Sequence, residues 1–153
     1  MSFRLLLKAA IPVAVLLTSV PAWAESRLAL VIGQSAYKSV PALPNPGNDA
    51  KAMSQLLTDS GFEVSQAADL TQSDMRAAVS DFAGKLAAKG PDTVALVFYA
   101  GHGIQVDGEN FLIPTDIDPK READIPMQAV RLNDSNADAI LAEFGQWALA
   151  FLR

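Results

Sequence analysis

The feature that most constrains the fold is an uninterrupted apolar run at residues 93–99, TVALVFY. Successive side chains of a β-strand point to opposite faces of its sheet, so a strand that is apolar at every position has to be covered on both faces. A second run of this kind, RLALVIG at residues 27–33, is rich in branched aliphatic residues and stops at a glycine. The two runs predict buried strands inside a sheet that has helices on both sides.

A helix is predicted over about residues 49–60, after a loop at residues 34–48 whose prolines forbid regular structure. Asn48 can cap this helix, and Gly61 ends it. Its core-facing side is expected to carry four apolar side chains, namely Ala50, Met53, Leu56 and Leu57.

A second helix is predicted to begin at Thr71, because Asp74 follows three residues later as a variant of the capping box. Gly90 and the proline after it stop this helix. Between the two helices, residues 62–67 alternate weakly and predict another strand. The buried stripe of the second helix is expected to be Met75, Val79, Phe82 and Leu86.

The order of strand, helix, strand, helix and strand indicates an α/β fold with a mostly parallel sheet of about four to six strands. After the third strand, Asp107-Gly108 is a turn pair typical of a β-hairpin. A polar connection at residues 114–126 and a helix at about 133–144 are expected to follow. The tail at residues 147–153 is apolar but short, and we expect a single domain over residues 25–153.

Residues 1–24 have the pattern of a secretory signal peptide. A positively charged start precedes an apolar stretch at residues 9–17, and Ala22-Trp23-Ala24 is a small-x-small cleavage sequence. The apolar stretch is short of the roughly 20 residues that span a bilayer, so we expect cleavage after Ala24 rather than anchoring. This predicts a periplasmic or secreted protein with no membrane association after cleavage.

Composition excludes several function classes. The formal net charge of −5 argues against general nucleic-acid binding. The 153 residues contain no cysteine, which excludes disulfides, thiolate metal sites and thiol chemistry within this chain. One histidine and scattered carboxylates do not make a transition-metal site, and we expect no cofactor. Asp116 and Asp118 could attract calcium loosely, although solvated surface charge is the more common reason for such residues.

The single histidine, His102, lies between two glycines directly after the strand at residues 93–99. Functional sites of open α/β sheets form beyond the carboxyl ends of the strands, where the loops at residues 34–48 and 100–103 should meet. Histidine is the commonest general base, and flanking glycines allow a sharp turn that leaves its ring open. The alternative is a turn histidine that hydrogen-bonds its own loop.

Four segments together resemble the caspase and metacaspase superfamily of cysteine peptidases. The resemblance covers about residues 27–118, and its most specific part is Tyr-Ala-Gly-His-Gly with the Phe-Leu-Ile-Pro element downstream. It implies a caspase-like three-layer α/β sandwich. The segments are LVIG at residues 30–33, NDA at 48–50, VFYAGHG at 97–103 and NFLIPTD at 110–116.

This resemblance implies peptide-bond hydrolysis by a Cys-His dyad, with peptides or proteins as substrates. His102 matches the catalytic histidine, and the backbone N–H of Gly103 is implied as an oxyanion donor. Asp49 matches an acidic residue that helps line the primary specificity pocket in metacaspase-like members, which implies cleavage after Arg or Lys. The alternative for Asp49 is an ordinary residue of the first helical turn.

The sequence departs from the family at the nucleophile. Caspase-type enzymes place the cysteine about 50 residues after the histidine, near position 152 here, on the strand that follows the next helix. Residues 147–152 look like the start of that strand, but no cysteine, serine or threonine lies there. Either the catalytic domain is C-terminally incomplete, which we favour, or the chain is a pseudoenzyme that keeps the fold for binding. In both cases we expect no peptidase activity from this chain alone.

Overall fold

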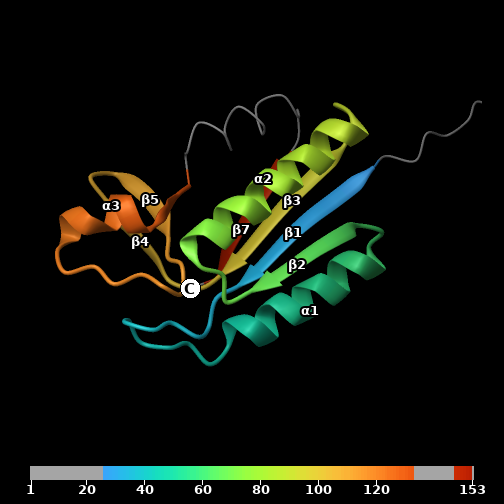
Figure 1. The fold of residues 1–153 in the computed structure, drawn as a ribbon. Helices are drawn as coiled ribbons and strands as arrows, with labels where there is room; N and C mark the ends of the chain where they lie inside the picture. Colours follow the sequence, from blue (N-terminus) through green and yellow to red (C-terminus); the bar gives the residue numbers. More distant parts are fainter. Residues whose placement is uncertain (1–25, 133–146, 153) are drawn as a thin grey trace, which may run out of the picture.

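The structure is a computed structural model that describes residues 26–132 and 147–152. Its centre is a four-stranded sheet in the order β2-β1-β3-β7, with all three neighbouring pairs parallel (Figure 1). The two apolar runs form the interior strands, as predicted. The strands are β1 (Arg27–Gly33), β2 (Glu63–Ala68), β3 (Val94–Ala100) and β7 (Trp147–Leu152).

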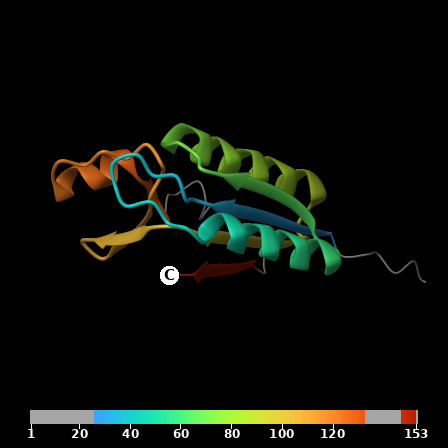
Figure 2. The same cartoon turned by 90° about the horizontal axis from the view of Figure 1, so that it is seen from below.

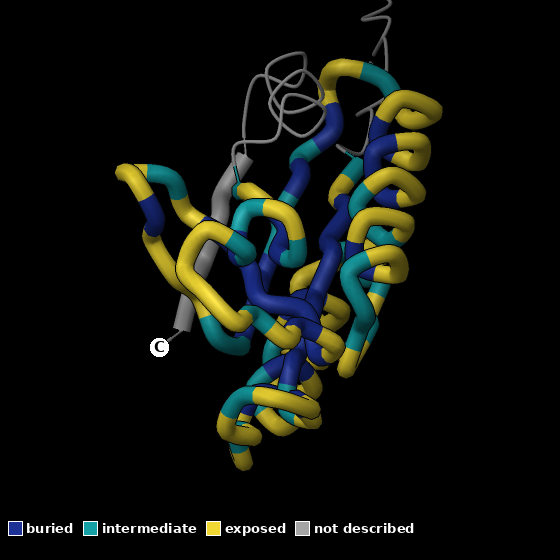
Figure 3. Tube along the Cα trace, turned by 60° about the vertical axis from the view of Figure 1, so that its left-hand side comes forward, coloured by how far each residue is buried: buried dark blue, intermediate teal, exposed yellow. Residues whose placement is uncertain are grey.

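Two helices, α1 (Pro46–Asp59) and α2 (Gln72–Lys89), cover opposite faces of this sheet. Alternation along β1 explains the two layers, because Leu28, Leu30 and Ile32 pack with α2 residues, whereas Ala29 and Val31 pack with α1 residues. Burial follows the strands, and the outer sides of the helices are exposed (Figure 3). The predicted three-layer α/β sandwich is therefore confirmed.

The start of α1 differs from the prediction. The helix begins at Pro46, and Asn48 lies inside its first turn rather than capping it. Proline is well suited to the first helical position, because it has no N–H to leave unpaired and its φ is already helical. The interpretation of this proline as a helix breaker was therefore wrong.

The buried face of α1 also differs at one position. Ala50 and Leu57 are buried as expected, but Leu56 is 59% exposed. The partly buried Met53 packs against the core cluster on this face, and Ser54 takes the remaining place on the buried side. The buried stripe of α1 is therefore narrower than the four apolar residues predicted, and it extends back to Pro46, where the helix begins.

Helix α2 agrees with its prediction. Thr71 is the N-cap, and its side chain accepts a hydrogen bond from the backbone N–H of Asp74 at 3.2 Å. Gly90 ends the helix with a φ of 95°. Of the predicted stripe, Met75, Phe82 and Leu86 are buried, and Val79 is partly buried against them.

A second, three-stranded antiparallel sheet follows β3, in the order β4-β5-β6. The predicted hairpin turn is present, with Asp107 and Gly108 both at positive φ. The segment after it, for which only a polar connection at residues 114–126 was predicted, holds a short 3₁₀ helix, η1, a short helix, α3, and β6. The elements are β4 (Gly103–Val106), β5 (Glu109–Leu112), η1 (Glu122–Asp124), α3 (Ile125–Gln128) and β6 (Val130–Arg131).

The carboxyl ends of the parallel strands point toward this smaller sheet and α3 (Figures 1 and 2). Gly33 pairs with Ala100 in the register, and Ala100 pairs with Leu152 on its other side. The tips of β1, β3 and β7 therefore meet at one edge. The predicted strand at residues 147–152 is confirmed as β7, whereas the predicted signal peptide and the predicted helix at residues 133–144 lie outside the described residues. No helix within the described ranges is long and apolar enough to cross a membrane.

Candidate active site

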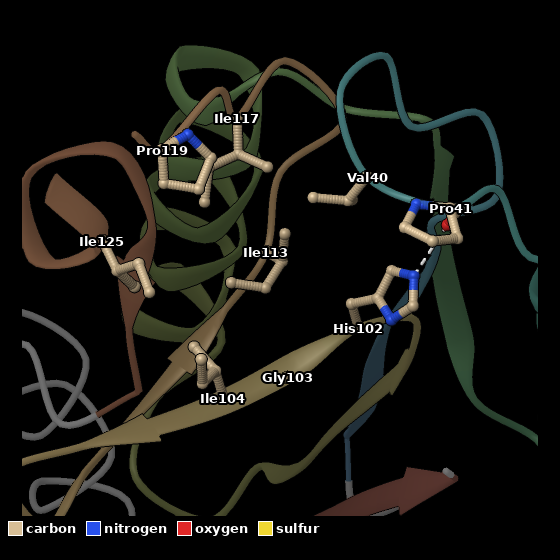
Figure 4. A pocket seen from close by; sticks show the side chains of 9 residues that line it. All are labelled: Val40, Pro41, His102, Gly103, Ile104, Ile113, Ile117, Pro119 and Ile125. Atoms are coloured by element: carbon tan, nitrogen blue, oxygen red, sulfur yellow. Dashed lines mark hydrogen bonds between the residues drawn. The ribbon is translucent and has the colours of Figure 1, made fainter. Parts of the chain in front are cut away.

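His102 leaves the tip of β3 and reaches across to the loop that follows β1. Its Nε2 atom lies 2.8 Å from the carbonyl oxygen of Pro41 (Figure 4). A carbonyl oxygen can only accept, so the neutral imidazole carries its proton on Nε2 and presents Nδ1 as the base. The hydrogen-bond partner of the imidazole therefore comes from a distant segment rather than from the histidine's own loop.

Tyr37 is the second contact of the imidazole. The two ring centroids are 4.6 Å apart, with the ring planes tilted by 52°. The Tyr37 hydroxyl also accepts a hydrogen bond of 2.8 Å from the backbone N–H of His102. Backbone and side chain of the histidine are thus both held by one buried aromatic residue.

The loop that carries Tyr37 and Pro41 is itself fixed by groups at the end of β2. The side chain of Gln34, fully buried, exchanges two hydrogen bonds with the backbone of Leu70, at 2.6 and 2.8 Å. The carboxylate of Asp69 accepts from the N–H groups of Ser35 and Ala36, each at 2.8 Å. These bonds anchor the first residues of the proline-rich loop, which goes on to carry Tyr37 and Pro41.

An apolar pocket of about 270 Å³ opens beside the imidazole. Figure 4 shows His102 at one side of this pocket, with aliphatic side chains from the β1 loop, β4 and the connection to α3 around it. Such a surface suits an uncharged side chain of a bound peptide. The remaining lining residues are Val40, Pro41, Gly103, Ile104, Ile113, Ile117, Pro119 and Ile125.

The backbone N–H of Gly103 points away from β5. Ile113 donates to the carbonyl of His102 at 3.1 Å, which makes Gly103 and Leu112 a non-hydrogen-bonded pair of the ladder. β4 is an edge strand of its sheet, and Gly103 is exposed and lines the pocket. The geometry is compatible with the predicted role as oxyanion donor, which stays a prediction.

Asp49 lies in the first turn of α1, half-buried, with its backbone N–H bonded to Asn45. This turn sits at the tip of β1, because a Cβ on Gly33 would come within 2.7 Å of the Pro46 carbonyl oxygen. The fold thus brings Asp49 to the same sheet edge as His102. It does not line the apolar pocket, so its role in recognising basic side chains also stays a prediction.

Sequence reasoning missed Tyr37 and Pro41. Pro41 acts through a backbone carbonyl, which any residue possesses, so no residue pattern could reveal it. Tyr37 offered a weak signal, because it is the one aromatic residue in the proline-rich loop at residues 34–48.

No group of three or more His, Asp or Glu side chains that could hold a metal ion lies within residues 26–132 and 147–152. Asp116 and Asp118, the pair considered for calcium, have other partners. Asp116 accepts from the backbone N–H of Gln72 at 2.9 Å, and Asp118 pairs with Lys120 at 2.8 Å. The ammonium of Lys120 holds the pKa of the Asp118 carboxyl below its usual range.

A parallel sheet between two helical layers, with a histidine at the tip of a central strand and a small antiparallel sheet after it, defines a caspase-like fold. The family model for the caspase domain matches residues 26–143, and the chain belongs to this family. The predicted kinship is therefore confirmed, although the chain has no cysteine.

Among curated proteins, the chain is 38% identical over 93 residues to mucosa-associated lymphoid tissue lymphoma translocation protein 1 of Homo sapiens, and 37% identical to its Mus musculus homolog. The alignment covers 61% of this chain but 11% of each relative, so the chain spans about a tenth of their length.

Two solved structures share the fold. The Drosophila initiator caspase Dronc superposes with a TM-score of 0.61 at 13% identity, over 82% of this chain and 47% of that one. Protein GSU0716 from Geobacter sulfurreducens gives a TM-score of 0.59 at 20% identity, over 82% of this chain and 48% of that one. At these identities the likeness concerns the fold.

Proposed function

We propose that this chain supplies the histidine half of a cysteine-type endopeptidase site and by itself binds peptides without cleaving them. The observation that carries the proposal is the His102 imidazole, held through Nε2 by Pro41 at the tips of the parallel strands, which leaves Nδ1 as the atom that can act as a base. In the family this base activates a cysteine thiol and later protonates the leaving amine. The chain offers no thiol for that step.

The sheet register supports a position for the cysteine sulfur of a complete site directly after β7. Leu152, at the end of β7, pairs with Ala100, two residues before His102. A nucleophile placed directly after β7 would therefore stand at the same edge as the imidazole. This agrees with the spacing of about 50 residues between histidine and cysteine in caspase-type enzymes.

Peptide recognition is proposed to use a basic side chain before the scissile bond. Asp49 supports this, because it lies in the first turn of α1 at the tip of β1, and a carboxylate can pair with Arg or Lys. The test is binding of fluorescent peptides ending in Arg, Asp or Ala to the full chain, followed by anisotropy. We expect the Arg peptide to bind most tightly, and we expect Asp49→Asn to remove that preference.

Asp59, at the other end of α1, provides the matched control, because Asp59→Asn makes the same chemical change on the same helix. An Arg preference that survives in Asp49→Asn, or is lost equally in Asp59→Asn, would contradict the assignment of Asp49.

A non-catalytic binding domain of caspase fold is the second candidate, and the complete absence of cysteine favours it. In this case the apolar pocket beside His102 would be the main contact, and affinity would not depend on Asp49. Peptides with an apolar side chain but no basic residue separate the two functions, because only a general binding domain should hold them equally well.

Export through a signal peptide at residues 1–24 is also a proposal. It is supported by the charged start and the Ala22-Trp23-Ala24 sequence. We expect the exported form to begin at Glu25. N-terminal sequencing of the protein from the extracytoplasmic fraction tests this, and a chain recovered only from the cytoplasm with Met1 intact would refute it.

A further inference from the structure

Two tyrosine hydroxyls close a ring of hydrogen bonds around the backbone of His102. The histidine N–H lies 2.8 Å from the Tyr37 hydroxyl, the two hydroxyls are 3.4 Å apart, and the Tyr99 hydroxyl lies 2.8 Å from the carbonyl oxygen of His102. The Tyr99 hydroxyl also reaches the carbonyl of Ile113 at 3.1 Å. The ring starts and ends on one residue, the one that carries the imidazole.

The direction of each bond follows from the groups involved. An N–H can only donate and a carbonyl can only accept, so Tyr37 accepts from His102, and Tyr99 donates its one proton to the carbonyl of His102, which at 2.8 Å is nearer than that of Ile113 at 3.1 Å. The proton of Tyr37 is then directed to Tyr99. All bonds of the ring run the same way, an arrangement in which hydrogen bonds polarise and strengthen one another.

The ring requires both phenols to be neutral, and their surroundings ensure this. Tyr37 is 7% exposed and Tyr99 is 2% exposed. Burial raises the pKa of Tyr37, and burial raises the pKa of Tyr99 further, with the neighbouring Tyr37 adding to the effect. A phenolate at Tyr99 would face two carbonyl oxygens and would break the ring.

Gly101 leaves the space in which the two hydroxyls meet. A Cβ at this position would come within 2.6 Å of the Tyr99 hydroxyl and 2.7 Å of the Tyr37 hydroxyl. The glycine does not have positive φ, so its role is close approach rather than a left-handed turn. The ring therefore involves the loop after β1, the end of β3 and the residue just before the histidine.

We propose that Tyr37 and Tyr99 are positioning residues for the proposed base: their hydroxyls fix the backbone of His102, and this places the imidazole in the one rotamer that reaches Pro41. This inference rests on the proposed function for its biological meaning. It goes beyond that function because it assigns the orientation of the base to two buried phenols that do not line the pocket. Tyr37 acts on both parts of the histidine, since its ring also contacts the imidazole.

The experiment is NMR of the full chain labelled in histidine, in which His102 gives the only histidine signals. The variants are Tyr37→Phe and Tyr99→Phe, which remove one hydroxyl each and keep the rings. We expect the Hα–Hβ couplings of His102 to change from those of one rotamer to averaged values. Hydrogen exchange of the His102 amide should become about tenfold faster in Tyr37→Phe, as the loss of one buried hydrogen bond implies.

Phe98→Leu is the matched control, because Phe98 is equally buried in β3 but packs with α1 on the opposite face. The inference is supported if the His102 couplings are averaged in the two tyrosine variants but those of a single rotamer in Phe98→Leu. The comparison is made between variants with similar unfolding midpoints. One rotamer in both tyrosine variants would overturn the inference, and so would averaging of equal size in Phe98→Leu. Neither NMR readout involves a peptide, so the positioning role of the tyrosines and the proposed peptide binding can be refuted independently.

Discussion

The Nε2 atom of His102 lies 2.8 Å from the carbonyl oxygen of Pro41, a residue 61 positions earlier in the chain. This contact predicts the Nε2–H tautomer for the neutral ring. Long-range ¹H–¹⁵N correlation spectra above the histidine titration should show a larger Nε2–H fraction in the folded chain than in the urea-unfolded chain. A dominant Nδ1–H tautomer would mean that the Pro41 contact does not form in solution.

Two glycines flank His102, and they should respond differently to alanine. Gly101→Ala forces a methyl group against both tyrosine hydroxyls and should lower the free energy of unfolding by about 1–3 kcal/mol. Gly103→Ala brings its methyl to an ordinary contact of 3.6 Å with the Phe111 carbonyl oxygen and should change stability by less than about 0.5 kcal/mol. Urea denaturation measures both, and equal losses would contradict the packing described around Gly101.

Adjacent leucines on α1 provide a test of the corrected helix face. Leu57 is 6% exposed, so Leu57→Ala should cost about 2–5 kcal/mol of unfolding free energy. Leu56 is 59% exposed, and Leu56→Ala should stay within about 0.5 kcal/mol of the parent. Similar costs at the two positions, measured by thermal or urea unfolding, would restore the original interpretation that both leucines face the core.

The buried tyrosines predict a loss of stability in alkali. Burial holds the pKa of Tyr99 above its ordinary value of 10.0, so the folded state keeps a proton that the unfolded state releases. The stabilisation is complete below pH 10 and falls as the pH rises above it, by about 1.4 kcal/mol per pH unit for each such group. Urea midpoints between pH 9 and 11.5 measure this, and the slope should be shallower in Tyr99→Phe. An unchanged slope in that variant would show that Tyr99 ionises normally.

The sequence predicts the parallel sheet and α2 well, because each depends on local signals. The runs that became β1 and β3 are apolar at nearly every position, and Thr71 with Asp74 fixes the start of α2. The start of α1 was missed because Pro46 can either break a helix or open one, and only the packing of α1 against β1 decides between them. The same packing decides that Leu57, rather than Leu56, faces the sheet.

The candidate site was only half predictable. His102 stands out as the one histidine after a buried strand, and its flanking glycines mark it further. Its partners Tyr37 and Pro41 come from a loop whose conformation is set by Gln34 and Asp69 through bonds to distant backbone groups. Such long-range backbone contacts leave no periodicity in the sequence. The elements η1, α3 and β6 were missed because they are 3, 4 and 2 residues long, too short to show a periodicity.

The central claim is that the chain presents a base at the strand tips without a nucleophile to activate. Incubation of the full chain with a fluorogenic peptide ending in Arg tests it most directly, with His102→Ala measured in parallel. We expect no release of fluorophore above the buffer blank from either protein. Release by the parent chain that disappears in His102→Ala would contradict the account, because it would show that another group in this cysteine-free chain attacks the peptide bond.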